Sequence, residues 1–97
     1  MDADWNDWRY FLAVARSGST LTASRSLRVS QTTVARRIAA LETALGVILF
    51  ERRPGGYTLT GVGEALIEEA EALASAADLV EQKARARGRE TSGAVKL

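Results

Sequence analysis

The chain of 97 residues contains no cysteine and no histidine. Disulfide bonds, thiolate nucleophiles, histidine acid–base chemistry and cysteine or histidine zinc sites are therefore excluded. There is one proline, and no apolar run approaches the roughly 18 residues of a membrane-spanning helix. The acidic start, from Met1 to Asp4, lacks the pattern of a secretory signal. We therefore predict a cytoplasmic protein with no membrane partner, no metal, no cofactor and no catalytic residues.

Positive charge is concentrated in the first part of the chain. Residues 1–60 hold eight arginines and five acidic residues, a net charge of +3, whereas residues 61–97 have a net charge of −2. Arginine is the better donor for phosphate groups and guanine edges. This asymmetry favours nucleic-acid binding by the first part, although arginine is also common on solvated helix faces.

The hydrophobic pattern predicts three short helices in the first half of the chain. Apolar residues fall on one face of a helix over residues 4–17, for which Asp4 is the expected N-cap. Ser19 is the expected N-cap of a short second helix that runs to Leu27, and Ser30 caps a third helix over residues 31–44. Helices this short require tertiary packing to be stable in water.

A β-hairpin and one long helix are predicted to follow. Extended segments at 48–52 and 56–59 flank a turn of arginine, proline and two glycines, which indicates a two-stranded wing. The last helix, over residues 61–86, carries apolar residues at heptad spacing and six acidic residues but no basic one up to Glu81. We expect it to pair with a second copy rather than with DNA. The predicted dimer seam consists of Leu66, Ala70, Leu73, Ala77, Val80 and Ala84.

These elements predict a mainly α fold, a winged helix-turn-helix of three helices plus a two-stranded β wing, followed by a long dimerisation helix. Residues 1–60 form the DNA-binding domain and residues 61–87 the linker and dimerisation helix. Residues 88–97 are predicted to be a hinge and the start of a further domain that the chain lacks.

The third helix has the composition of a recognition helix that enters the major groove. Gln31 and Thr32 are expected to read base edges, because glutamine bonds adenine in a bidentate way and threonine offers a hydroxyl and a methyl group. Backbone contacts are expected mainly from the helix start and from the wing. The full set of predicted DNA-binding residues is Ser30, Gln31, Thr32, Thr33, Arg36, Arg37, Arg52 and Arg53.

Each of these residues also has a structural interpretation. Ser30 is a helix cap whether or not it binds phosphate. The structural alternative for Gln31 is a solvated polar residue, and for Thr32 and Thr33 it is a pair of tolerated first-turn hydroxyls. The adjacent Arg36 and Arg37 point in different directions, so one of them can bind phosphate while the other only faces solvent. The arginines of the wing are also explained as protection of an edge strand against aggregation.

A series of short motifs resembles one known family in order and spacing. They run from Tyr10 to Glu64. They read Tyr10-Phe11-Leu12-Ala13-Val14-Ala15, Gly18-Ser19, Val29-Ser30-Gln31, Val34-Ala35-Arg36-Arg37-Ile38, Leu41-Glu42, Leu45-Gly46, Leu49-Phe50-Glu51-Arg52 and Leu59-Thr60-Gly61-Val62-Gly63-Glu64. This series resembles the N-terminal part of the LysR-type transcriptional regulators.

The resemblance implies a bacterial, cytoplasmic, sequence-specific regulator that binds double-stranded DNA as a dimer or tetramer. It also implies a small-molecule effector, bound only through a C-terminal domain. Three residues depart from the family pattern: Thr20 stands in place of a phenylalanine, Thr32 in place of a proline and Ala35 in place of a serine. These departures bear on the target sequence rather than on the function.

Two other functional classes stay open. An interaction module with the same fold would lack salt-dependent affinity for duplex DNA. A carboxylate enzyme would have to use Glu68, Glu69 or Glu71, but a face of acidic residues on a helix is usually just solvated.

Overall fold

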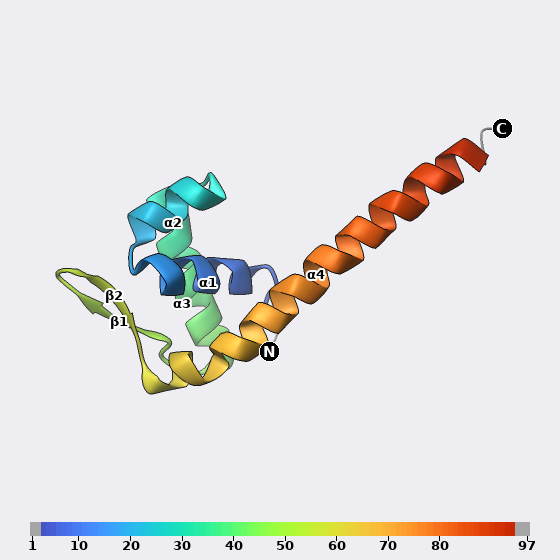
Figure 1. The fold of residues 1–97 in the computed structure, drawn as a ribbon. Helices are drawn as coiled ribbons and strands as arrows, with labels where there is room; N and C mark the ends of the chain where they lie inside the picture. Colours follow the sequence, from blue (N-terminus) through green and yellow to red (C-terminus); the bar gives the residue numbers. More distant parts are fainter. Residues whose placement is uncertain (1–2, 95–97) are drawn as a thin grey trace.

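Three short helices, a β-hairpin and one long helix follow one another in this computed structural model, which describes residues 3–94 (Figure 1). The elements are α1 (Asp7–Ser17), α2 (Thr20–Leu27), α3 (Gln31–Leu45), β1 (Phe50–Arg53), β2 (Gly56–Leu59) and α4 (Gly61–Ala94). The two strands pair antiparallel, with Phe50 opposite Leu59 and Arg53 opposite Gly56. This arrangement confirms the predicted winged helix-turn-helix followed by a long helix.

The helix starts follow local capping, with one exception. The hydroxyl of Ser19 accepts from the backbone N–H of Thr22 at 3.1 Å, as predicted for the start of α2. The prediction that Asp4 caps the first helix is wrong. Its carboxylate accepts from the N–H of Asn6 at 2.9 Å and closes a turn, and α1 begins only at Asp7.

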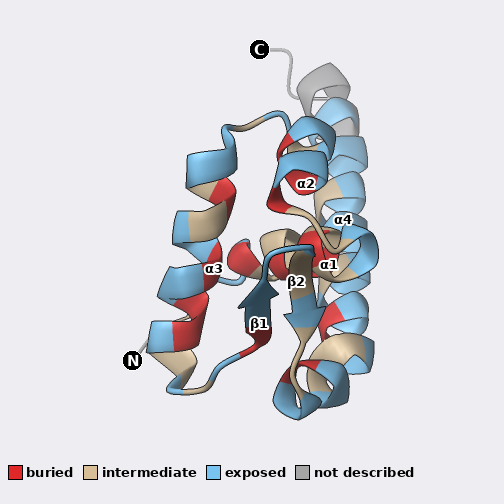
Figure 2. Ribbon diagram, turned by 90° about the vertical axis from the view of Figure 1, so that its left-hand side faces the viewer, coloured by how far each residue is buried: buried red, intermediate tan, exposed pale blue. Residues whose placement is uncertain are grey.

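The core lies where α1, α3, the hairpin and the start of α4 meet, and the buried side of α3 faces it (Figure 2). Phe11 on α1 is central to this core. Its ring lies 5.4 Å from that of Trp8 and 5.5 Å from that of Phe50 on β1. The Phe50 ring in turn lies 5.7 Å from that of Tyr57 on β2. An isolated hairpin is marginal in water, so these aromatic contacts stabilise the wing.

Glu42 near the end of α3 holds the wing at its base. Its buried carboxylate accepts from the backbone N–H groups of Leu49 at 2.8 Å and Phe50 at 3.2 Å. At the other strand, the N–H of Tyr57 donates to the carbonyl of Gly18 at 2.9 Å. The hairpin is therefore attached to α3 through one strand and to the end of α1 through the other.

The first turns of α4 belong to the core of the chain itself. Ala70 is buried, and Leu66, Ile67 and Ala74 pack against the core. Leu66 and Ala70, two residues of the predicted dimer seam, therefore pack against the core of their own chain. The heptad spacing could not reveal this, because a helix shows the same apolar pattern against either partner.

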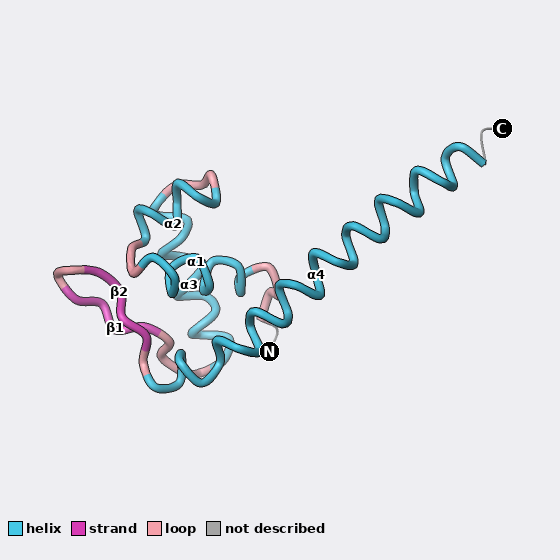
Figure 3. Tube along the Cα trace, viewed as in Figure 1, coloured by secondary structure: helices cyan, strands magenta, loops and turns pink. Residues whose placement is uncertain are grey.

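α4 also extends beyond its predicted end and runs unbroken to Ala94 (Figure 3). From the sequence, we predict a hinge from residue 88. Gly88 instead stays helical, because its neighbours are mostly good helix formers that offset the cost of one glycine. The predicted strand at residues 94–97 lies almost wholly outside the described residues.

Candidate nucleic-acid interface

The N-terminal end of α3 is a capped and exposed helix start. The hydroxyl of Ser30 accepts from the backbone N–H of Thr33 at 3.0 Å, which confirms Ser30 as the N-cap. The same hydroxyl lies 2.8 Å from the hydroxyl of Thr33. Ser30 is exposed and Thr33 half-buried, so the two hydroxyls form a fixed polar pair at the positive end of the helix dipole.

Gln31, the first residue of α3, is held by a neighbouring helix. Its side-chain Nε2 donates to the hydroxyl of Thr20 at 2.8 Å. Thr20 is the first residue of α2 and is only 7% exposed, whereas Gln31 is exposed. The amide of Gln31 is therefore accessible and also restrained, which the sequence alone did not indicate.

Thr32 and Arg36 share the exposed surface that follows Gln31 along α3, and Ala35 beside them is half-buried. Among the side chains described, those of residues 3–89, no carboxylate forms an ion pair with Arg36. Arg28 is a cationic neighbour outside the set of DNA-binding residues predicted from the sequence. It is exposed, ends α2 with a left-handed backbone at φ 60°, and precedes the Ser30 cap by two residues.

Arg37 is directed away from this surface. Its Nε lies 3.7 Å from Oδ1 of Asp7 at the start of α1, and the Asp7 side chain is only 5% exposed. Arg36 and Arg37 therefore have different environments, as their adjacency on a helix predicts. The structure brings Arg37 to the contact between α1 and α3, not to the group formed by Ser30, Gln31, Thr32 and Arg36.

The two arginines of the wing also differ. Arg52 donates to the hydroxyl of Tyr57 at 3.1 Å, stacks over its ring at 5.2 Å and reaches the carboxylate of Glu42 at 3.4 Å. The hydrogen bond to Tyr57 is the main cause that raises the pKa of Arg52. Arg53 is exposed and pairs with Glu51 at 2.7 Å. Arg52 thus ties the wing to α3, and Arg53 is the more accessible cation.

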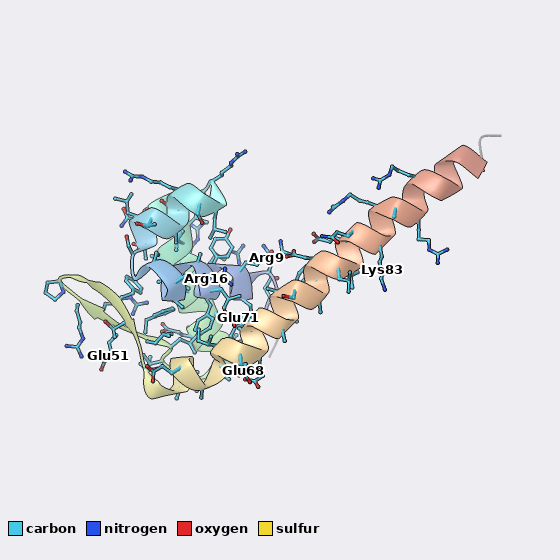
Figure 4. The ribbon with its side chains drawn as sticks, in the orientation of Figure 1. Arg9, Arg16, Glu51, Glu68, Glu71 and Lys83 are labelled. Carbon is cyan, nitrogen blue, oxygen red and sulfur yellow. The ribbon has the colours of Figure 1, made fainter. Side chains whose placement is uncertain are left out.

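Acidic residues of α4 neutralise the arginines of α1 (Figure 4). Arg9 lies 2.9 Å from the carboxylate of Asp78, and Arg16 lies 3.8 Å from that of Glu71. These pairs join the long helix to α1. The cationic residues that stay without such partners in the described part of the chain include Arg28 and Arg36.

Further along α4, an apolar face is open to solvent. Leu73 is 39% exposed and Val80 65% exposed, and Trp5 beside them is 48% exposed. A hollow of about 340 Å³ lies between these three side chains, and Ala77 contributes to its wall. Ala84, the last residue of the predicted seam, is exposed as well. We call Trp5, Leu73, Ala77, Val80 and Ala84 the exposed apolar face.

The described residues include no cluster of side chains suited to a metal ion. They also include no helix that is long and apolar enough to cross a membrane.

Comparison with known proteins finds the same fold in transcriptional regulators. The chain is 37% identical over 94 residues to the HTH-type transcriptional regulator ClcR of Pseudomonas putida, which covers 97% of this chain and 32% of that protein. It is 46% identical over 67 residues to the regulator TfdS of Cupriavidus pinatubonensis, or 69% of this chain and 23% of that one. The chain therefore spans about a third or less of the length of these relatives. Their names support a regulator rather than an enzyme.

Solved structures agree with this result. The CbnR DNA-binding domain in complex with DNA matches with a TM-score of 0.78 at 36% identity, over 88% of this chain and 98% of that one. An OxyR of Corynebacterium glutamicum matches with a TM-score of 0.84 at 30% identity, over 88% of this chain and 27% of that one. The family model described as "Bacterial regulatory helix-turn-helix protein, lysR family" matches residues 5–64. The chain belongs to this family.

Proposed function

We propose that the chain is the DNA-binding and dimerisation part of a bacterial transcriptional regulator that recognises a two-fold symmetric duplex site. One observation carries the proposal: the capped start of α3 exposes Gln31, Thr32 and an unpaired Arg36 on a fold shared with a DNA-bound relative. A helix presented in this way enters the major groove by its N-terminal residues.

The residues of this surface make two kinds of contact, with base edges and with phosphate groups. Gln31 and Thr32 read base edges, because they lie at the exposed tip of α3. Ser30 and Thr33 offer hydroxyls to a phosphate at the helix N-terminus, and Arg36 supplies the charge.

The remaining arginines take different roles in this proposal. Arg53 on the wing, together with Arg28, binds the flanking backbone, because both are exposed. Arg37 and Arg52 have a structural role. Arg37 stabilises α3 through its ion pair with Asp7, and Arg52 stabilises the wing through its ion pair with Glu42.

Two copies associate through the exposed apolar face of α4. Leu73 and Val80 expose apolar surface to solvent, and Trp5 extends that surface from the turn before α1. Contiguous exposed apolar surface of this kind marks protein–protein contacts. A two-fold dimer places two α3 helices on the same side of a duplex, so half-sites lie about one helical turn or a multiple of it apart.

The chain covers about a third of ClcR, so the rest of such a regulator has a role of its own. We infer that a small-molecule effector binds outside the described residues, in a C-terminal domain, and that the full-length protein is a dimer or a tetramer. A regulator of bacterial promoters acts in the cytoplasm, where its DNA target lies.

Selection of bound duplexes from a random pool at near-physiological salt tests the proposal. We expect enrichment of an interrupted two-fold site, and affinity that falls steeply as salt rises. Weak salt-dependent binding without enrichment would contradict sequence recognition by this part of the protein. No binding to any duplex would contradict the proposal and favour a protein-interaction module.

A further inference from the structure

The hydrogen bond between Gln31 and Thr20 joins the first residues of α3 and α2. Gln31 Nε2 donates to Thr20 Oγ1 at 2.8 Å, across eleven positions of sequence. The hydroxyl of Thr20 is well placed for this task because the residue is only 7% exposed and is fixed by the capped start of α2. Gln31 itself is exposed on the candidate DNA-binding surface.

This bond orients the Gln31 amide and leaves part of its hydrogen-bonding capacity free for DNA. A glutamine amide has two N–H donors and one carbonyl acceptor, and Thr20 takes only one of the donors. In the arrangement of the structure, with Nε2 turned toward Thr20, the remaining N–H and the carbonyl form a donor–acceptor pair in one order. Without the bond, the long side chain of Gln31 would occupy many rotamers and lose that freedom on binding.

The fixed order matches one base in the major groove. Adenine presents the N7 acceptor beside the N6 donor, which complements the free N–H and the carbonyl of Gln31. Guanine presents the N7 and O6 acceptors, so its O6 would meet the carbonyl oxygen of the held amide. The orientation therefore favours adenine and disfavours guanine.

We propose that Thr20 is a positioning residue for base recognition, which holds the Gln31 amide in the order that selects adenine at one base pair of each half-site. This inference rests on the proposed function, since it requires α3 to enter the major groove. Thr20 does not touch the DNA in this arrangement and acts only through Gln31.

The test first locates the base pair and then removes the hydroxyl. Gln31→Ala identifies the position in the selected site at which base preference is lost. Thr20→Val then removes the hydroxyl at nearly constant shape, Thr20→Ser keeps it, and Thr22→Val makes the same change at an exposed position of the same helix. Affinities are measured for duplexes that differ only at the identified base pair.

We expect the starting protein, Thr20→Ser and Thr22→Val to prefer adenine over guanine by roughly tenfold or more, the scale of one bidentate contact. Thr20→Val should lose most of that preference while it keeps its affinity for non-specific duplex. In the Gln31→Ala background, Thr20→Val should change nothing further. A general loss of folding would instead lower both affinities together.

Other outcomes overturn the inference. Thr20→Val with an undiminished adenine preference, or a starting protein that prefers guanine at this pair, refutes the role of Thr20 while the proposed function stands. A starting protein that selects no site refutes both. If Thr20→Val does not fold, Thr20→Ala removes the same hydroxyl. The side-chain amide signals of Gln31 in the nuclear magnetic resonance spectrum then report whether its amide is held without DNA.

Discussion

The guanidinium Nε of Arg37 lies 3.7 Å from Oδ1 of Asp7, a buried carboxylate oxygen that has no hydrogen-bond partner among the described residues. Burial raises the pKa of Asp7 above its usual value of 3.8, and the charge of Asp4 adds to the rise, whereas Arg37 opposes it. The folded state therefore binds the Asp7 proton more tightly than the unfolded state does. Ionised Asp7 consequently destabilises the fold.

Asp7→Asn should remove this effect. A group with a raised folded-state pKa stabilises the fold below that pKa, and the contribution is lost as pH rises from about 3.8 through the raised value. The free energy of unfolding of Asp7→Asn should therefore increase relative to that of the starting protein as pH rises from about 3, below the usual aspartate pKa, to about 7, above it. Urea unfolding at each pH measures this gain.

Glu68→Gln is the matched control, because Glu68 is an exposed carboxylate of α4. Its curve of stability against pH should run parallel to that of the starting protein. A parallel curve for Asp7→Asn as well would contradict a raised pKa at Asp7.

Glu42→Ala should destabilise the domain by about 2–4 kcal/mol, since it leaves two buried backbone N–H groups, those of Leu49 and Phe50, without an acceptor. Glu42→Gln keeps one carbonyl oxygen and should cost less than half as much. Urea unfolding compares the two variants. Equal losses would mean that the negative charge facing Arg52, and not the acceptor, is what the fold needs.

The local features of this fold are predictable, and the long-range ones are not. Ser19 and Ser30 were identified as caps because each donor lies three residues from its acceptor in sequence. The partner of Arg37 lies thirty residues away on α1, and nothing in the chain between them marks the pair. The same limit applies to Ala70, since an apolar stripe on a helix does not say whether its partner belongs to the same chain.

Arg36→Ala should weaken binding to every duplex and reduce the slope of log affinity against log salt by about 1, as expected for one lost phosphate contact. Arg37→Ala should leave that slope unchanged, because its guanidinium faces Asp7. Fluorescence anisotropy at several salt concentrations measures both. Arg85→Ala, at an exposed position far along α4, controls for the loss of one charge. An equal change of slope in Arg36→Ala and Arg85→Ala would refute a specific contact by Arg36.

Leu73→Glu should convert the dimer into a monomer at micromolar concentration, because the new charge would be buried among apolar side chains of a second copy. Sedimentation velocity measures the change. Gln82→Glu adds the same charge to an exposed position on the opposite side of α4 and should stay dimeric. A dimeric Leu73→Glu would show that the exposed apolar face does not hold two copies together.

Gly63→Ala should destabilise the domain by about 1–3 kcal/mol, the usual cost of overpacking. A Cβ at this position would lie 2.5 Å from the carbonyl oxygen of Leu49, a backbone atom that the bond from Thr60 holds in place. Gly61→Ala lies in the same turn of α4 and meets nothing within 4 Å. It should stabilise the helix by up to about 1 kcal/mol, the usual gain when alanine replaces a helical glycine. Opposite shifts of the melting temperature are therefore expected from the same chemical change two residues apart. Shifts of the same sign would mean that α4 does not start against the base of the wing.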